Sequence, residues 1–296
     1  MSAIGIITVL YRSQNVIDGF IASLNAQDHK DFEVYFVQND DQDTYSEVRI
    51  QETAEFKWIY VQNDANVGVA TGNNQGIDYF LTRGDIKYVH FLNNDIEVDP
   101  SFLSAQIQLF NDRREIDALA PKMFYYGTNG KIWYAGGCLS YLKGGPRHYG
   151  HHKKDSLVGK DLYLVDYAPT CSVLLKKSVL ASTGIRMWDE LFVYHDDYVF
   201  CKELKKNGVK LWYAPNIHLQ HKVSAATGGK KSDFSRYYLT RNWLYVILKS
   251  KSALLVIIPF VWVYYYISKS KIECLAIKDA FGMACSKTNS NTLNKT

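Results

Sequence analysis

Short apolar runs alternate with amphipathic segments through the first 92 residues, and this alternation restricts the fold more than any other feature. Segments 15–26 and 69–81 have apolar residues at helical spacing. Strands that alternate with helices form parallel sheets covered on both faces. We therefore predict an α/β fold with a doubly wound, mostly parallel central sheet, flanking helices and a C-terminal helical extension. The runs that predict buried strands are 5–10, 32–37, 56–61 and 88–92.

The second half of the chain is less regular. Segment 121–170 is rich in glycine, and its three histidines (His148, His151 and His152) are more readily solvated than bound to a metal. Beyond it we predict strands at 166–175 and 209–213, the second ended by Pro215, and helices at 198–207 and 237–248.

Composition excludes several classes of protein. Hydrophobic residues make up 47% of the 296 residues, which is enough for a sizeable core. The net charge of +4 is too small to indicate nucleic-acid binding. The five cysteines are scattered without a CxxC pair, so a zinc or disulfide framework is not expected. The chain enters its first strand without a signal peptide, and a reduced, cytoplasmic setting follows as our expectation.

Two acidic clusters follow apolar runs, at 93–100 and 192–198. In open α/β sheets ligands bind at the carboxyl ends of strands, so we expect the polar residues after the second and fourth strands to face one crevice. Asp95 suits Mg²⁺ or Mn²⁺, and His221 is a second candidate ligand, although alone it is more readily structural. Asp196 and Asp197 open a helix, where one acid can cap the helix and the other can act as a base.

A glycine-rich turn covers residues 66–76 and leads into a helix. Gly68, Gly72 and Gly76 have neither GxGxxG nor P-loop spacing. A helix N-terminus with glycines can bind a phosphate. The alternative is that these small residues let the helix pack closely on the sheet, and the sequence alone does not separate the two interpretations.

Taken together, the motifs resemble glycosyltransferase family 2, and within it the rhamnosyltransferase-like branch that builds bacterial surface polysaccharides. The resemblance runs from residue 6 to about residue 282. It rests on the order of these pieces: Tyr11, segment 66–76, the DXD-like segment 93–100, Pro121-Lys122, segment 133–137, segment 188–197, Tyr213-Ala214-Pro215 with His221, and segment 237–242.

This resemblance implies a GT-A fold and an inverting glycosyl transfer. Asp95 would hold a divalent metal (Mn or Mg) on the donor diphosphate with His221, Asp197 would deprotonate the acceptor hydroxyl, and Asp196 would orient the acceptor or the base. Gln38 stands where the family has an aspartate for the nucleobase. The implied nucleotide-sugar site comprises Tyr11, Gln38, Asn39, Asp40, Asn66, Gly68, Gly72, Asn73, Asn94 and Arg241.

The implied donor is a dTDP- or UDP-sugar, and the implied acceptor is a lipid-linked or growing glycan of an O-antigen or capsule. We expect a catalytic domain at 1–235, with its nucleotide-sugar half at about 1–100 and its acceptor half at about 101–235. A helical region would follow at 236–285 and a polar tail at 286–296.

Segment 253–267 is almost wholly apolar and has lysines on both flanks. It is shorter than the ~20 residues of a membrane-spanning helix, and its tryptophan and tyrosines suit the headgroup layer of a membrane. We therefore expect a peripheral protein on the inner face of the cell membrane. A buried helix or a homodimer contact is the alternative.

Two other functions compete with the transferase. A non-catalytic nucleotide-sugar or glycan binding subunit would be consistent with Gln38 and Asn93, where the family often has aspartates. A Rossmann oxidoreductase would share the alternation of strands and helices, but the glycine fingerprint is missing.

Overall fold

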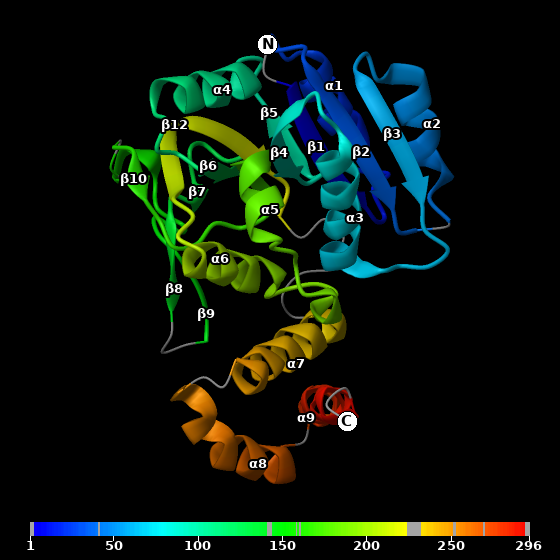
Figure 1. Ribbon diagram of the computed structural model, residues 1–296, viewed down its shortest axis with the longest axis vertical. Coiled ribbons are helices and arrows are strands. Elements are labelled where there is room, and N and C mark those ends of the chain that lie inside the picture. The colour runs from blue at the N-terminus through cyan, green and yellow to red at the C-terminus, as the bar shows by residue number, and fades with distance from the viewer. Residues whose placement is uncertain are drawn as a thin grey trace.

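The computed structural model describes residues 3–40, 42–140, 144–157, 159, 161–223, 232–250, 253–268 and 270–293. Within these residues one large twisted sheet is covered by helices, and three C-terminal helices lie beneath it in Figure 1. The α-helices are α1 (Ile17–Asn25), α2 (Thr44–Thr53), α3 (Gly68–Thr82), α4 (Phe102–Asp112), α5 (Lys177–Thr183), α6 (Asp196–Lys206), α7 (Asp233–Lys249), α8 (Ile258–Ile267) and α9 (Lys271–Leu293). Short 3₁₀ turns are η1 (Asp155–Leu157), η2 (Asp189–Leu191) and η3 (Ala253–Ile257).

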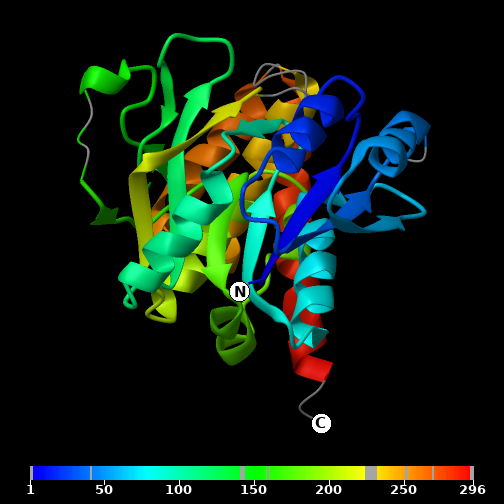
Figure 2. The same cartoon turned by 90° about the horizontal axis from the view of Figure 1, so that it is seen from above.

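The large sheet has the order β10-β12-β6-β11-β4-β1-β2-β3, with β5 paired to β12 and β7 to β6. Seen from above, it runs from the blue N-terminal strands to the green and yellow strands of the second half (Figure 2). The strands are β1 (Ala3–Leu10), β2 (Phe32–Gln38), β3 (Lys57–Gln62), β4 (Ile86–Leu92), β5 (Ile96–Val98), β6 (Ala118–Tyr125), β7 (Ile132–Tyr134), β10 (Tyr163–Leu164), β11 (Ser172–Lys176) and β12 (Leu211–His221). A separate hairpin pairs β8 (Gly137–Ser140) with β9 (Gly145–His148).

The two halves of the sheet differ in strand direction. β4, β1, β2 and β3 are parallel neighbours, as the alternating pattern predicts. β11 then runs antiparallel to both β4 and β6, while β12 runs parallel to β6. The α/β class with a mostly parallel central sheet, flanking helices and C-terminal helices is confirmed.

Helices cover both faces of the parallel half. On β2, the neighbouring residues Tyr35 and Phe36 point to opposite faces, as strand geometry requires. The Tyr35 ring stacks on Tyr79 of α3 with centroids 4.8 Å apart, whereas Phe36 meets Phe20 of α1 at 6.4 Å. Both faces of this strand are therefore buried, which explains its nearly continuous apolar sequence.

Two expected strands differ from those observed. The run predicted at 166–175 forms a strand only at β11, and its first half is irregular. The strand predicted to end at Pro215 continues as β12 to His221. A register shift between Ala214 and His218 lets the proline sit where no ladder hydrogen bond is needed.

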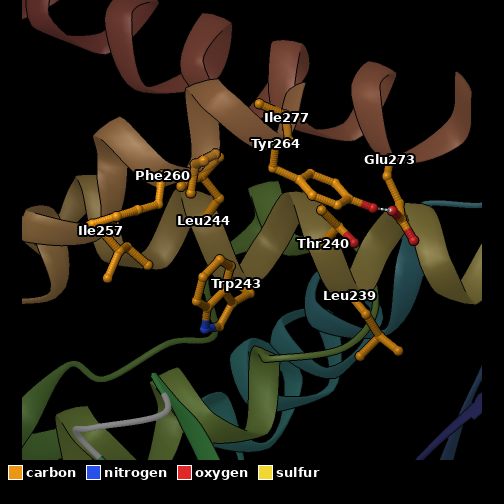
Figure 3. A pocket seen from close by; sticks show the side chains of 10 residues that line it. Leu239, Thr240, Trp243, Leu244, Ile257, Phe260, Tyr264, Glu273 and Ile277 are labelled. Carbon is orange, nitrogen blue, oxygen red and sulfur yellow. Dashed lines mark hydrogen bonds between the residues drawn. The ribbon is translucent and has the colours of Figure 1, made fainter. Parts of the chain in front are cut away.

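The C-terminal helices line an open apolar cavity of about 550 Å³ between α7, α8 and α9. Figure 3 shows Trp243 and Leu244 of α7, Phe260 and Tyr264 of α8, and Ile277 of α9 around it. No residue of α8 is buried. Within the described residues, no helix combines the length and the apolar character that a membrane crossing needs.

Candidate active site

The carboxyl ends of β1, β2 and β4 meet at one edge of the sheet, because neighbouring parallel strands end together. The loop after β1 is tied to the loop after β4, since Asn94 Nδ2 donates to Ser13 Oγ at 2.5 Å. Ser13 Oγ also accepts from the backbone N–H of Tyr11 at 3.1 Å, and the Ser13 N–H donates to Asp43 Oδ2. Tyr11 and Asn94 therefore lie at the same edge of the sheet and are joined through Ser13.

Asp95 and His221 lie together although 126 positions separate them. Asp95 Oδ2 is 3.2 Å from His221 Nε2, and the two side chains are only 15% and 7% exposed. β12 brings them together, because its last residues pair with β5 directly after Asp95, and the Lys222 N–H donates to the Asp95 carbonyl at 2.8 Å.

This pair fits a divalent metal. Asp95 Oδ1 and His221 Nδ1 are buried and have no hydrogen-bond partner in the described part of the chain. A carboxylate with an imidazole suits Mn²⁺, and Mg²⁺ would take the carboxylate. No group of three or more acidic, histidine or cysteine side chains gathers for a metal among the described residues. The protein thus offers two donors, and the remaining positions would come from phosphate oxygens and water.

Asp196 and Asp197 open α6 and have different surroundings. Asp196 is 5% exposed, and its Oδ2 lies 3.5 Å from Thr170 Oγ1. Burial, followed by the negative charge of Asp197, raises the pKa of Asp196 to about 7. Asp197 is half-buried, and burial raises its pKa too. Two hydrogen bonds oppose that rise: Tyr167 Oη donates to Asp197 Oδ2, and the Tyr198 N–H donates to Oδ1 at 2.6 Å.

A row of aromatic rings joins the two acidic places. The Trp133 ring lies 4.5 Å from His221 and 4.9 Å from His148, measured between centroids. His148 in turn stacks on Tyr167 at 5.5 Å, and Tyr167 is the donor to Asp197. His221 and Asp197 are therefore linked by one row of rings from β7, β9 and the segment before β11.

The loop that leads into α6 has an unusual backbone. Phe192, Tyr194 and His195 have φ values of 65°, 64° and 61°, a region that side chains other than glycine rarely occupy. Burial lowers the pKa of His195 to about 4, so this neighbour carries no positive charge at neutral pH. The strain lies directly before the two acids, where such backbone outliers often mark a functional site.

The residues expected to hold the nucleobase follow β2. Gln38 is fully buried, its Oε1 accepts from the Asp40 N–H at 3.0 Å, and its Nε2 lies 3.4 Å from the Asp43 carbonyl. Asn39 Nδ2 donates to the Gly68 carbonyl at 3.2 Å. Asp40 is half-buried, and its Oδ1 accepts from the Gln42 N–H at 3.1 Å. Gln38 and Asn39 thus shape the loop from within, and Asp40 lies nearer its surface.

The glycine-rich turn serves close packing. A Cβ at Gly72 would lie 2.9 Å from Val9, and one at Gly76 would lie 2.5 Å from Ile7. Gly68 has φ +84°, and a Cβ there would lie 2.5 Å from the Phe192 carbonyl oxygen. These glycines therefore let α3 approach β1 and the strained loop, which favours the packing interpretation of the turn.

The N-terminus of α3 is occupied by protein atoms. The Val69 N–H donates to the Phe192 carbonyl at 2.6 Å, and the Gly68 N–H donates to Asn66 Oδ1 at 3.0 Å. Asn73 is 3% exposed, and its Nδ2 lies 3.5 Å from the Met187 sulfur. Asn66 thus binds the first N–H of α3, while Gly68 and Asn73 lie against the segment that leads to the acids.

Arg241 lies on α7 and is 9% exposed. Its Nη2 donates to the carbonyls of Glu190 and Leu191, and its Nε donates to Asn242 Oδ1 at 2.8 Å. The guanidinium carbon also lies 4.6 Å from the centre of the Tyr238 ring. These contacts are with the strained loop and with α7 itself.

Sequence reasoning missed Tyr167 and the role of Asn242. Tyr167 stood inside a predicted strand, where nothing signalled that its hydroxyl would reach an acid thirty positions away. The sequence marks Asn242 only as the last residue of segment 237–242 and gives it no role of its own. A buried asparagine inside an apolar helix is itself a signal, since its amide must find partners.

Comparison with known proteins decides the family. Residues 5–180 match the family described as glycosyl transferase family 2. The chain belongs to glycosyl transferase family 2. An uncharacterized glycosyltransferase of Methanocaldococcus jannaschii is 23% identical over 230 residues, which cover 75% of this chain and 73% of that protein. The family expected from the order of motifs is thus confirmed.

Solved structures resemble the fold. S. aureus TarS 1–349 in complex with UDP-GlcNAc matches with a TM-score of 0.56 and 16% identity, over 96% of this chain and 80% of that chain. GalNAc-T7 with UDP, GalNAc and Mn²⁺ matches with a TM-score of 0.59 and 10% identity, over 83% of this chain and 47% of that chain. The chain spans 66% of another structure of S. aureus TarS 1–349 and 41% of a structure of S. aureus TarS. At these identities the likeness shows the GT-A-like fold alone.

Proposed function

We propose that the protein is an inverting glycosyltransferase that moves a sugar from a nucleoside-diphosphate donor to a hydroxyl group of a glycan. The observation that carries this proposal is the placement of Asp197. Its carboxylate is oriented by Tyr167 and by the Tyr198 N–H, at one end of a row of rings whose other end is the Asp95–His221 pair. Family membership supports the reaction class, and UDP in the similar structures supports a nucleotide-sugar donor.

In the proposed reaction Asp197 accepts the proton of the acceptor hydroxyl. The freed oxygen attacks the anomeric carbon from the side opposite the diphosphate, a C–O bond forms, and the nucleoside diphosphate leaves with the electrons of the broken bond. Burial raises the pKa of Asp196 to about 7, and in its protonated form Asp196 would donate a hydrogen bond to the acceptor or to Asp197. Asp95 and His221 would hold a divalent ion, which when bound offsets the negative charge of the leaving diphosphate.

The finer assignments extend this proposal. The motif order supports a dTDP-rhamnose or UDP-hexose donor and a lipid-linked acceptor in O-antigen or capsule synthesis. Gln38, Asn39 and Asp40 would form the nucleobase end of the site, with Tyr11 and Asn94 beside the diphosphate. We further propose a catalytic domain at 1–235 and a C-terminal region at 236–285 that rests on the inner face of the membrane through α8. The exposed apolar side chains of α8, among them Phe260, Val263 and Tyr266, support that placement.

The test is Asp197→Asn with purified protein, UDP-GlcNAc or dTDP-rhamnose, and Mn²⁺, Mg²⁺ or EDTA. We expect wild type to release nucleoside diphosphate from one donor in a metal-dependent way. The variant should lose at least about 100-fold in kcat, as removal of a general base does, while the Kd for the nucleotide changes little. Asp78→Asn, which alters only a surface pair with Arg186, is the matched control.

Two results would count against the proposal. An active Asp197→Asn enzyme would remove the base assignment. Nucleotide binding without any turnover, in wild type and across donors and glycan acceptors, would instead support the non-catalytic binding subunit.

A further inference from the structure

The strained loop before α6 is held from outside by two consecutive residues of α7. The Asn242 side chain is fully buried, and its Nδ2 lies within donor distance of three carbonyl oxygens. Those oxygens belong to Leu191 at 2.7 Å, Val193 at 2.7 Å and Tyr194 at 2.9 Å. One amide thus gathers three carbonyls from four consecutive residues, which an extended or helical backbone would not present to one point.

Arg241 completes this clamp. Its Nη2 donates to the Glu190 carbonyl at 2.9 Å and to the Leu191 carbonyl at 3.0 Å. Its Nε donates to Asn242 Oδ1 at 2.8 Å, so the arginine also fixes which way the amide faces. A third contact from α7 joins Ser235 Oγ and Tyr194 Oη at 2.8 Å.

The clamped loop also reaches the donor side of the site. The Phe192 carbonyl accepts hydrogen bonds from the N–H groups of Val69 and Ala70 at 2.6 and 3.4 Å. At its other end the loop runs directly into Asp196 and Asp197. A displacement of the loop would therefore move the start of α3 and the two acids together.

We propose that Asn242, oriented by Arg241, is a positioning residue of the transfer reaction. Its amide holds residues 191–194 in the conformation in which Phe192 and Tyr194 have positive φ, and this conformation aims Asp197 at the acceptor hydroxyl. The assignment rests on the proposed function and gives Arg241 a role within the protein in place of contact with phosphate. An ordinary core asparagine would stabilise the fold without separating binding from turnover.

The experiment replaces Asn242 by aspartate, which has nearly the same shape but no N–H donors. The three carbonyls would then face a carboxylate, so the loop should leave its strained conformation. Misplacement of a catalytic group by about 1 Å costs on the order of 100-fold in rate. We expect Asn242→Asp to lower kcat by about that factor, while the Kd for UDP or dTDP and the donor KM stay within about threefold.

Two further variants guard against trivial loss of folding. Asn207→Asp makes the same chemical change at the exposed end of α6, where the amide donates only to the Glu203 carbonyl, and it should behave as wild type. Arg241→Lys keeps one donor and the charge but lacks the fork, so it should lower kcat by about 10-fold without changing nucleotide affinity. Thermal unfolding is measured for every variant.

The outcomes separate the two proposals. Wild type without turnover on any donor would defeat the proposed function. With active wild type, an Asn242→Asp enzyme of normal kcat would overturn the positioning role. A third result would also overturn the inference. If Asn242→Asp and Arg241→Lys both fail to fold, or both lose nucleotide affinity and kcat in parallel, the clamp serves stability alone.

Discussion

At the scale of single residues, two neighbouring aspartates acquire different properties from their surroundings. Asp196 is enclosed and has Thr170 near one oxygen, whereas Asp197 is half-buried and accepts two hydrogen bonds. Hydrogen bonds to a carboxylate favour its charged form, and burial without them favours the neutral form. Burial raises the pKa of both groups, that of Asp196 to about 7, while the hydrogen bonds from Tyr167 and Tyr198 oppose the rise at Asp197. The two carboxyl groups thus differ in how readily they lose a proton, a division of roles that acid–base catalysis uses.

Tyr167 is the residue through which this division can be tested. Its hydroxyl lowers the pKa of Asp197 by donating a hydrogen bond, so Tyr167→Phe should raise that pKa. A base works only when deprotonated, and the acid limb of the pH–rate profile should move to higher pH. We expect a several-fold loss of kcat/KM at pH 6 that shrinks toward pH 9. The pH dependence of kcat/KM for the donor measures it.

The control for this shift is Tyr163→Phe, which removes a hydroxyl that donates to the Ala135 carbonyl instead of to an acid. Its pH profile should overlay that of wild type. An acid limb that stays in place in Tyr167→Phe would show that Asp197 is not the group that controls the rate.

At the scale of secondary structure, α3 depends on glycines because it packs directly on β1. A Cβ at position 76 would lie 2.5, 2.7 and 2.9 Å from three carbons of Ile7, which cannot move away within a packed sheet. We expect Gly76→Ala to lower the free energy of unfolding by about 1–3 kcal/mol, as overpacking does. Urea unfolding measures this change.

Gly282→Ala provides the matched comparison, since Gly282 also lies inside a helix but has no atom within 4 Å of its Cβ position in the described structure. Alanine should there be neutral or stabilise by up to about 1 kcal/mol. If both substitutions had the same effect, the close approach of α3 to β1 would not be what requires the glycine.

The bounds of helices and strands could be predicted from sequence where apolar residues repeat at helical or strand spacing. β1, β2 and α3 differ from their predicted bounds by no more than two residues, because burial on both faces or on one helical stripe repeats along the chain. The sequence predicts that β12 ends before Pro215, because it does not reveal the register shift that accommodates the proline. The same strand carries His221, whose proximity to Asp95 follows from pairing across 126 positions rather than from any local pattern.

The candidate site divides in the same way. Asp95, Asp196 and Asp197 could be selected from sequence, because each follows an apolar run. Burying an acidic side chain at the end of such a run costs free energy. The clamp formed by Arg241 and Asn242 could not be selected in this way, since its acceptors are backbone carbonyls and any sequence can provide a carbonyl. Those carbonyls converge because Phe192 and Tyr194 have positive φ. Phenylalanine and tyrosine rarely adopt positive φ, so the sequence does not predict this conformation.

At the scale of the whole molecule, α7 contacts both the strained loop before α6 and the other C-terminal helices. One side of α7 holds the loop through Arg241 and Asn242, while Leu239, Trp243 and Leu244 line the cavity toward α8 and α9 (Figure 3). Arg236 of α7 also pairs with Glu273 of α9 at 2.9 Å. α7 therefore connects α8 and α9 to the loop that precedes the proposed base.

The surface that α8 contacts should be an anionic membrane. Phe260 and Tyr266 of α8 are 72% and 78% exposed, and lysines flank segment 253–267 in the sequence.

Burial of one such ring contributes about 1.5–3 kcal/mol, so Phe260→Ser should weaken binding to phosphatidylglycerol vesicles by about 10-fold or more. Leu164→Ser, which removes an exposed apolar side chain from β10 (55% exposed), should leave vesicle binding unchanged. Cosedimentation with vesicles and sedimentation equilibrium without them distinguish the outcomes. A different outcome is that wild type does not bind vesicles but forms a dimer that Phe260→Ser dissociates. In that case α8 is a contact between two copies of the chain, because the same apolar side chains are buried against protein instead of lipid.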